Sequence, residues 1–286
     1  MPELPEVEVV KQSLNKKIKF QKIKKILVRN RNLRFKVPKK FELFLTNKLI
    51  SKISRKSKYL VFHLNNKTFL IFHLGMSGSM HLSAKKNFIN TNLSFYGSLN
   101  LPMKHNHIIF IFSNYKLIYN DPRRFGFVKT FKDKKELEFF FNKYGPEPFN
   151  KKFNVDYVHN LLKNKKKNIK NFLLDQNFVS GIGNIYASEI LYYCKINPFK
   201  KAEKLSIKNI KKLIYFAKFV LRKAIKKGGS SIRNFKNIKG NIGNYQSEFK
   251  VYNRQDLNCL DKFCSGKIIK KNISNRSTFF CNNCQK

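Results

Sequence analysis

Tryptophan is absent from this 286-residue sequence, and acidic residues are scarce, with 16 Asp and Glu against 60 Lys and Arg. The net charge of +44 excludes an ordinary enzyme of small acidic metabolites with no polyanion nearby, and it favours nucleic acid or an anionic membrane surface as the partner. Hydrophobic residues make up 42% of the chain, which excludes a disordered basic tail. Because abundant Lys, Asn, Ile and Phe also follow from an AT-rich genome, the charge indicates a class of partner without naming it.

Long hydrophobic runs are missing too. The longest apolar segments, such as 108–112, have the length of a strand and are far too short to span a bilayer. The acidic N-terminus lacks the basic start and apolar run of a signal peptide. Four of the five cysteines lie in the last 28 residues, which argues against a secreted disulfide framework. We therefore expect a cytoplasmic protein that has no membrane segment and carries a metal site.

The hydrophobic pattern divides the chain into regions of different structure. Apolar runs at 59–64 and 68–74 flank an Asn-Asn-Lys turn, and runs at 107–112 and 116–119 flank a second turn, so residues 23–131 are predicted to form an antiparallel sandwich or barrel. Helical spacing predicts a helix over 6–14, before this sheet region. Residues 144–148 are rich in Gly and Pro and mark a domain boundary. Beyond them, a long helix is predicted from Ser206 to Gly228.

The cysteines near the C-terminus form two pairs separated by two strand-like segments. Two residues separate Cys281 from Cys284, which is the usual spacing, whereas four residues separate Cys259 from Cys264. Two thiolate pairs joined by a hairpin predict a zinc ribbon, in which one structural Zn²⁺ replaces a core too small to hold itself. The alternative is four unligated buried thiols. Cys194, alone in a helical stretch, is predicted to be a core residue.

The N-terminus is a second candidate for chemistry. If Met1 is removed, Pro2 carries a free secondary amine, which has a pKa near ~8 in model compounds and is partly unprotonated at neutral pH. Such an amine can attack an aldehyde-like carbon and form an iminium, and Glu3 beside it can donate or accept a proton. Composition alone favours the plainer interpretation that these residues begin a helix.

Seven stretches of the sequence, taken together, resemble the bacterial formamidopyrimidine-DNA glycosylase family. They run from one end of the chain to the other, and their joint order is far more specific than any one of them. They are MPELPEVE at 1–8, SKYL at 57–60, HLGMSG at 73–78, DPRRFG at 121–126, GPEP at 145–148, GNIYASE at 183–189 and the cysteine tail.

The resemblance implies an α+β fold with four parts. It implies an N-terminal antiparallel β-sandwich with flanking helices (1–132), a linker (133–150), a helix-two-turn-helix DNA-binding domain with a lesion loop (151–250) and the zinc ribbon (251–286). Residues 230–245 resemble the loop that covers the everted base. The interior of this loop departs from the commoner pattern, which makes base recognition the least transferable property of the family.

The resemblance also implies a catalytic set. In this family the N-terminal proline, here Pro2, attacks C1′ of the damaged nucleotide while Glu3 protonates the sugar. Expulsion of the base leaves an iminium that permits β- and then δ-elimination. Lys58 matches the lysine that supports β-elimination, and Arg276 matches the ribbon arginine tied to δ-elimination. Both cations also suit the phosphates that flank an extruded nucleotide.

Further residues match the family's DNA contacts. A base must leave the duplex before an N-terminal amine can reach its sugar, and the hole that remains must be filled. Met76, Arg123 and Phe125 match the void-filling trio, with burial in the core as the alternative for Met76 and Phe125. His73, His105, Lys166 and Asn184 match other DNA-contact positions. The spacing of His105 and His107 also suits a metal, although no third ligand is evident.

Three functions remain open at this point. The first is a bifunctional glycosylase and AP lyase of base excision repair, acting on oxidised purines in double-stranded DNA as a nucleoid-associated bacterial monomer. The second is the related endonuclease VIII type, which prefers oxidised pyrimidines. Leu4 in place of Gly and the Met76, Arg123 and Phe125 set favour the first. The third is a non-catalytic zinc-ribbon DNA-binding protein, against which the intact catalytic set speaks.

Overall fold

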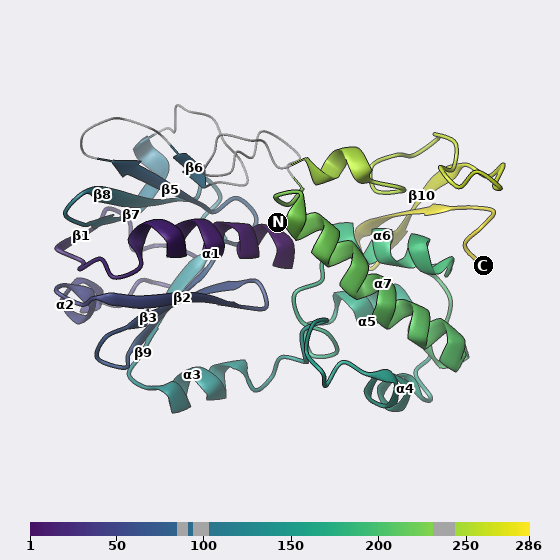
Figure 1. Cartoon of the computed structure of the whole chain (residues 1–286), viewed down its shortest axis with the longest axis horizontal. Helices are drawn as coiled ribbons and strands as arrows, with labels where there is room; N and C mark the ends of the chain where they lie inside the picture. The colour runs from purple at the N-terminus through teal and green to yellow at the C-terminus, as the bar shows by residue number, and fades with distance from the viewer. Residues whose placement is uncertain (85–90, 94–102, 231–243) are drawn as a thin grey trace. The chain divides into compact units, whose positions relative to one another are not determined.

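The computed structural model describes residues 1–84, 91–93, 103–230 and 244–286 (Figure 1). They divide into two compact units, each described here by itself. Unit 1 comprises Met1–Asn142 with Ile225–Gln246, and unit 2 comprises Lys143–Ala224 with Ser247–Lys286. The boundaries predicted at 132, 150 and 250 stay predictions. Most of the predicted lesion loop, 231–243, lies outside the described residues.

Unit 1 is built on two antiparallel sheets, which confirms the predicted sandwich. Both predicted hairpins are present, because β3 (Tyr59–Leu64) pairs with β4 (Phe69–His73) and β7 (Asn106–Ile111) pairs with β8 (Tyr115–Asn120). Strands β3 and β4 are almost wholly buried, as expected for the apolar runs that form them. The five-stranded sheet has the order β1 (Lys25–Val28), β7 (Asn106–Ile111), β8 (Tyr115–Asn120), β5 (Ser79–Ala84) and β6 (Thr91–Leu93). The four-stranded sheet has the order β2 (Ile50–Lys56), β3 (Tyr59–Leu64), β4 (Phe69–His73) and β9 (Phe127–Phe131).

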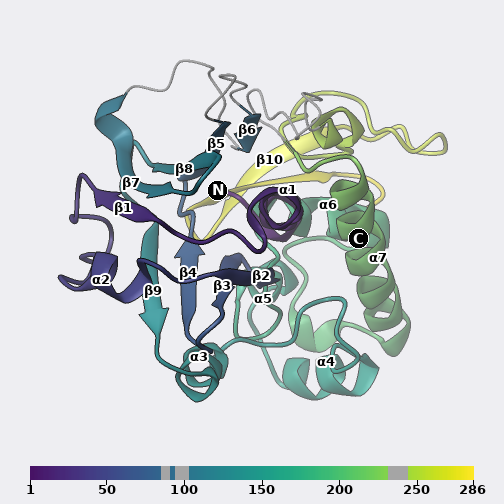
Figure 2. The same cartoon turned by 60° about the vertical axis from the view of Figure 1, so that its left-hand side comes forward.

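Helix α1 (Leu4–Ile18) runs along the sandwich beside β2 and is seen end-on in Figure 2. It begins two residues before the predicted start, because Pro5 stands in its first turn and the Glu6 carboxylate accepts a hydrogen bond from the Glu3 amide at 2.9 Å. Its apolar face joins the core of the sandwich. The other helical segments of unit 1 are α2 (Phe41–Leu45), the 3₁₀ turn η1 (Met103–His105), α3 (Lys134–Phe141) and part of the 3₁₀ turn η3 (Tyr245–Glu248).

Unit 2 combines helices with a C-terminal hairpin. Ser206 precedes its longest helix and accepts a hydrogen bond from the Asn209 amide at 3.3 Å, and the helix ends before Gly228, as the sequence predicts. The helices are α4 (Val155–Leu162), α5 (Ile169–Leu174), α6 (Asn184–Cys194), the 3₁₀ turn η2 (Ala202–Lys204) and α7 (Ile207–Lys226), whose last two residues belong to unit 1. The hairpin consists of β10 (Ile268–Ile273) and β11 (Arg276–Cys281).

A buried carboxylate joins α6 to the segment that leads into the hairpin. Glu189 is fully buried and accepts backbone hydrogen bonds from Lys250, Val251 and Tyr252 at 2.9, 3.0 and 2.8 Å. Burial raises the pKa of Glu189, and the three amide donors oppose that rise. Three aligned donors fit the carboxylate anion, so Glu189 holds residues 250–252 against α6.

No helix in the described part of the chain is long and apolar enough to cross a membrane. This agrees with the short apolar runs of the sequence.

We expect Glu189→Gln to lower the free energy of unfolding by about 2 kcal/mol, because an amide replaces one acceptor oxygen with a donor that faces backbone N–H groups. The urea midpoint followed by circular dichroism measures the loss. Glu203→Gln makes the same chemical change at an exposed position of η2 and serves as the control. Equal midpoints for the two variants would contradict the anchoring role of Glu189.

Candidate functional site

The N-terminal residues are held against the sandwich rather than extended into solvent. Pro2 is buried, and Glu3 is only 3% exposed at the N-cap of α1. With Met1 in place the α-amine belongs to Met1, and its pKa is lowered chiefly by burial. The charges of Glu3 and Glu6 oppose that effect, whereas Lys58 and Arg123 add to it. The predicted residues Pro2, Glu3 and Lys58 therefore share one neighbourhood.

Lys58 lies on the tight turn between β2 and β3. It is only 6% exposed, and Ser57 before it has a left-handed φ of 54°. Arg55 holds this turn, because its Nη1 donates to the Ser57 carbonyl at 2.9 Å and its Nε donates to Glu8 of α1 at 2.9 Å. Burial raises the pKa of Glu8, but hydrogen bonding from Lys11 and the ion pair with Arg55 together hold it below its usual value. Helix α1 thus positions both the chain end and Lys58.

His73 ends β4, where it stacks on Phe127 and also contacts Tyr59. Burial, followed by the charges of Lys58 and Arg34, lowers the pKa of His73 to about 4. The Gly75 amide donates to His73 Nδ1 at 3.1 Å, so the neutral ring carries its proton on Nε2. His73 therefore offers an uncharged N–H donor at neutral pH.

Met76 and Phe125 lie on surface loops. Their exposed fractions are 40% and 42%, so the alternative that they belong to the core is wrong. The guanidinium of Arg123 lies over the Phe125 ring at 4.5 Å. His105 is half-buried, and His107 Nε2 is 2.8 Å from the Asp121 carbonyl. Within the described residues, only the four clustered cysteines form a group of at least three ligands able to hold a metal, so the His105 and His107 pair is not such a site.

In unit 2, Arg276 follows the two-residue turn of the hairpin and is exposed. Ser274 and Asn275 have left-handed φ values of 47° and 59°, as a tight hairpin turn requires. The next residue, Ser277, is held from two sides. Its carbonyl accepts hydrogen bonds from Asn184 Nδ2 at 2.9 Å and from the Nζ of the fully buried Lys170 at 3.2 Å.

Lys170 also donates to Thr278 Oγ1 at 2.7 Å, so a buried cation sets the start of β11. Nothing in the local sequence around Lys170 distinguishes it from the many surface lysines, so its role was not predicted. Glu6, Arg55 and Glu8 were not predicted as functional residues either. The capping pattern of Glu3 and Glu6 was the available signal for Glu6.

Lys166 and Arg276 line one cavity of unit 2, which has a volume of about 970 Å³. The cavity lies between the α4–α5 connection and the turn of the hairpin. Lys165 and Lys167 add to its positive charge, and Asp175 contributes a carboxylate. Two residues predicted to contact one strand of nucleic acid are thus brought together.

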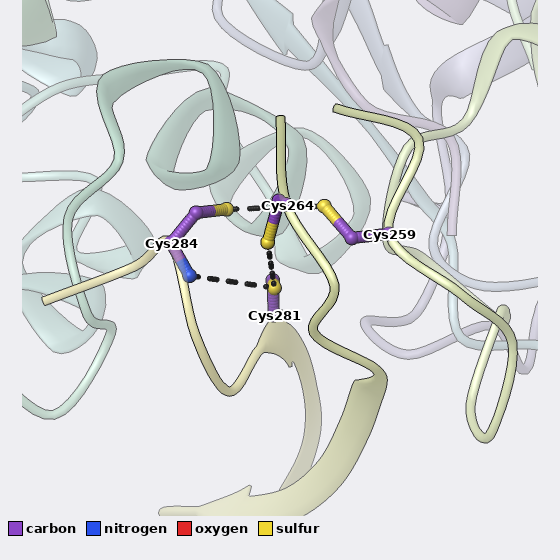
Figure 3. A group of neighbouring side chains, drawn as sticks. All are labelled: Cys259, Cys264, Cys281 and Cys284. Carbon is purple, nitrogen blue, oxygen red and sulfur yellow. Dashed lines mark hydrogen bonds between the residues drawn. The ribbon is translucent and has the colours of Figure 1, made fainter. Parts of the chain in front are cut away.

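The four C-terminal cysteines converge (Figure 3). Their sulfur atoms all lie within 4.8 Å of one another, and the Cys259–Cys284 and Cys264–Cys281 sulfur distances are 3.8 and 3.6 Å. Tetrahedral zinc with Zn–S bonds of about 2.3 Å requires sulfur separations of about 3.8 Å, so the cluster fits a zinc ion. The widened spacing of Cys259 and Cys264 does not prevent convergence.

Neighbouring donors point at these thiols, as expected around metal-bound thiolates. The amide of Gly266 donates to Cys264 Sγ at 3.4 Å, and the amide of Cys284 donates to Cys281 Sγ at 3.5 Å. The Tyr192 hydroxyl lies 3.5 Å from Cys259 Sγ.

Family models and individual relatives both identify the family of this chain. Residues 1–128 match the family model of the formamidopyrimidine-DNA glycosylase N-terminal domain, and residues 144–236 match that of its H2TH domain. Formamidopyrimidine-DNA glycosylases of Wolbachia sp. subsp. Brugia malayi (strain TRS) and Rickettsia bellii (strain OSU 85-389) are 39% and 40% identical to this chain, with 100% of both proteins covered. The chain belongs to the formamidopyrimidine-DNA glycosylase family.

Solved structures of this family share the fold. A Lactococcus lactis FPG mutant in complex with Fapy-dG-containing DNA is 35% identical, with a TM-score of 0.88 and 100% coverage of both chains. The Lactococcus lactis protein in complex with DNA that contains an abasic site is 35% identical, with a TM-score of 0.87 and 99% coverage of both chains. The predicted fold class is confirmed. The chain is therefore a DNA glycosylase of DNA repair, and the non-catalytic hypothesis falls.

The low pKa of His73 makes folding stability depend on pH. Between about pH 4 and pH 6.5 the unfolded state binds a proton at this histidine and the folded state does not, so stability falls as pH is lowered through this window. We expect His73→Gln, which retains an acceptor for the Gly75 amide, to show a shallower loss. Urea unfolding at pH 4.5, 5.5, 6.5 and 7.5 measures both slopes.

His159→Gln makes the same substitution at an exposed histidine of α4 and is the control. If His73→Gln and the wild type lost stability at the same rate between pH 6.5 and 4.5, the neutral state of His73 would be refuted.

Proposed function

We propose that this glycosylase excises oxidised purines, namely 8-oxoguanine and formamidopyrimidines, from double-stranded DNA and then cleaves the strand as an AP lyase. The Lactococcus lactis complexes with Fapy-dG-containing DNA and with abasic-site DNA support this substrate class. The observation that carries the proposal is the placement of the chain end: Pro2 and Glu3 are buried, and the charges of Glu3, Glu6, Lys58 and Arg123 all act on the terminal amine, which Met1 carries in this structure.

The nucleophile is the Pro2 amine, set free by removal of Met1. Pro2 is buried, and its free amine attacks C1′ of the damaged nucleotide. An N–C1′ bond forms, the sugar ring opens as Glu3 protonates its oxygen, and the bond from C1′ to the base breaks. The base leaves with a proton, and an iminium joins Pro2 to the sugar.

Strand cleavage follows from the iminium, which makes the C2′ proton acidic. Loss of that proton expels the 3′-phosphate ester, and Lys58, held beside the N-terminus, stabilises the negative charge that develops. A second elimination expels the 5′-phosphate ester, with Arg276 as the cation that assists. Hydrolysis of the remaining imine frees Pro2 and leaves a one-nucleotide gap.

DNA binding divides between phosphate contacts and filling of the vacated space. His73, through its neutral Nε2–H, and His105, Lys166 and Asn184 bind the backbone. The shared cavity of Lys166 and Arg276 supports this role for Lys166. Met76 and Phe125 enter the stack, and Arg123 pairs with the base opposite. The exposure of both apolar side chains supports the assignment.

Cys259, Cys264, Cys281 and Cys284 hold one structural Zn²⁺. The metal stabilises the ribbon from which Arg276 projects, and the chemistry is performed by the protein's own groups.

Borohydride reduction should trap the wild-type enzyme covalently on a duplex with 8-oxoguanine opposite C, because reduction converts the iminium to a stable amine. Trapping on a duplex with thymine glycol should be weaker. The adducts are measured by gel shift and mass spectrometry. Preference for thymine glycol would favour the endonuclease VIII type, and no adduct on either duplex would refute covalent catalysis.

A protein that retains Met1 is the sharper control, because its amine is primary and one residue out of place. We expect no adduct at Pro2 from this form. Pro2→Gly is uninformative by itself, since glycine keeps a terminal amine.

Purified enzyme should contain one zinc ion per chain by elemental analysis, since the four sulfur atoms lie within 4.8 Å of one another and two of their separations, 3.8 and 3.6 Å, are close to those of tetrahedral zinc. Cys281→Ser should lose the metal and lower the unfolding midpoint, whereas Cys194→Ala, at a buried thiol outside the cluster, should retain it. Full zinc content in Cys281→Ser would contradict the assignment.

A further inference from the structure

Two loops of unit 1 carry the side chains proposed to fill the vacated stack, and they cross between the sheets side by side. The Met76 loop (residues 74–78) leads from β4 to β5, and the Phe125 loop (residues 121–126) leads from β8 to β9. Strand β4 pairs with β9 in one sheet, and β5 pairs with β8 in the other. The two loops therefore connect the same two strand pairs and run between them in opposite directions.

The two loops are in close backbone contact. Gly75 has a left-handed φ of 61°, and a Cβ on it would lie 2.4 Å from the Phe125 carbonyl carbon. A Cβ on Gly126 would lie 2.0 Å from the Tyr119 hydroxyl oxygen. No side chain fits at either place, so neither loop can shift independently without opening this contact.

The Asp121 carboxylate accepts hydrogen bonds from both loops. Asp121 is fully buried. Its Oδ1 accepts from the Ser77 hydroxyl at 2.5 Å, and its Oδ2 accepts from the Gly126 amide at 2.8 Å and from the Tyr119 hydroxyl at 3.0 Å. Burial and the charge of Asp121 raise the pKa of Tyr119, which keeps that hydroxyl protonated as a donor.

Ser77 completes the link. Its Oγ donates to Asp121 and also accepts a hydrogen bond from the Arg123 amide at 3.1 Å. Ser77, which follows Met76, is thus hydrogen-bonded to Arg123, which lies two residues before Phe125. The Asp121 backbone adds contacts to Arg124 and His105, at 3.1 and 3.0 Å.

We propose that Asp121, acting through Ser77, is a positioning residue that locks the Met76 and Phe125 loops into one preassembled wedge, so that a base can leave the duplex without these loops having to order first. The proposal rests on the proposed function, since it takes the wedge role of Met76 and Phe125 from it. Ordering two loops during catalysis would cost conformational entropy, and the preformed network has met that cost during folding.

The test compares two reactions of the same enzyme under single-turnover conditions. Excision of 8-oxoguanine opposite C requires a paired base to be extruded, whereas cleavage at a preformed abasic site requires no base to leave its pair. We expect Asp121→Asn and Ser77→Ala each to slow excision about tenfold, and to slow abasic-site cleavage less than about threefold, since each loses one or two hydrogen bonds of the lock.

Ser77→Ala keeps the test decisive if Asp121→Asn folds poorly, because Ser77 is half-buried at the loop surface. Ser51→Ala is the matched control, since it removes a half-buried hydroxyl that donates to the His63 carbonyl on β3 at 3.0 Å, away from both loops. It should leave both reactions unchanged. Equal slowing of the two reactions by Ser77→Ala would mean that the network is merely structural, and would overturn the proposal.

A double-mutant cycle tests whether Ser77 acts through the wedge. In a background of Met76→Ala and Phe125→Ala, adding Ser77→Ala should reduce excision by less than about twofold, because the loops it positions no longer carry the wedge. A full tenfold reduction in that background would overturn the proposal. If the proposed chemistry is wrong, borohydride does not trap the wild type on DNA. If only the positioning role of Asp121 and Ser77 is wrong, trapping succeeds and the variants slow both reactions equally.

Discussion

Helix α1 holds the first residues of the chain against the sandwich, and the proposed chemistry depends on that attachment. Chain ends ordinarily fray, and a frayed amine would meet a sugar carbon only by chance. Here the Glu6 carboxylate accepts hydrogen bonds from two backbone amides. One is the amide of Glu3, and the other is the amide of Ser230, at 2.8 Å, which immediately precedes residues 231–243. One acidic side chain thus fixes both the N-terminus and Ser230, the first residue of the predicted lesion loop.

The same helix reaches Lys58 through Glu8 and Arg55. Helix α1 therefore positions the N-terminal amine, Glu3 and Lys58 together. In unit 2 the same principle operates with different parts, because the buried Lys170 and Asn184 hold the residues that follow Arg276. Both units place a cation at a tight hairpin turn and fix that turn through a side chain from a neighbouring helix or strand.

Local patterns in the sequence predicted much of this. The hairpin at 59–73, the helix that follows Ser206 and the cysteine hairpin are each determined by neighbouring residues, so periodicity and turn chemistry revealed them. Sheet order, the Asp121 network and the burial of Lys170 depend on residues far apart in the chain, which no local pattern reports. The resemblance to a family supplied the candidate residues, but it gave no reason for their positions. The contacts of Glu8, Arg55 and Lys170 give that reason for Lys58 and Arg276.

The neutral state of His73 bears on how this strongly basic enzyme holds DNA. A lysine or arginine that meets a phosphate releases condensed counterions, so its contribution weakens as salt rises. A neutral imidazole N–H displaces no counterion. Burial, with the charges of Lys58 and Arg34, keeps His73 uncharged, so the DNA contact proposed for His73 would be insensitive to ionic strength. Part of the grip on the strand next to the N-terminus would then persist where the long-range attraction of the +44 chain is screened.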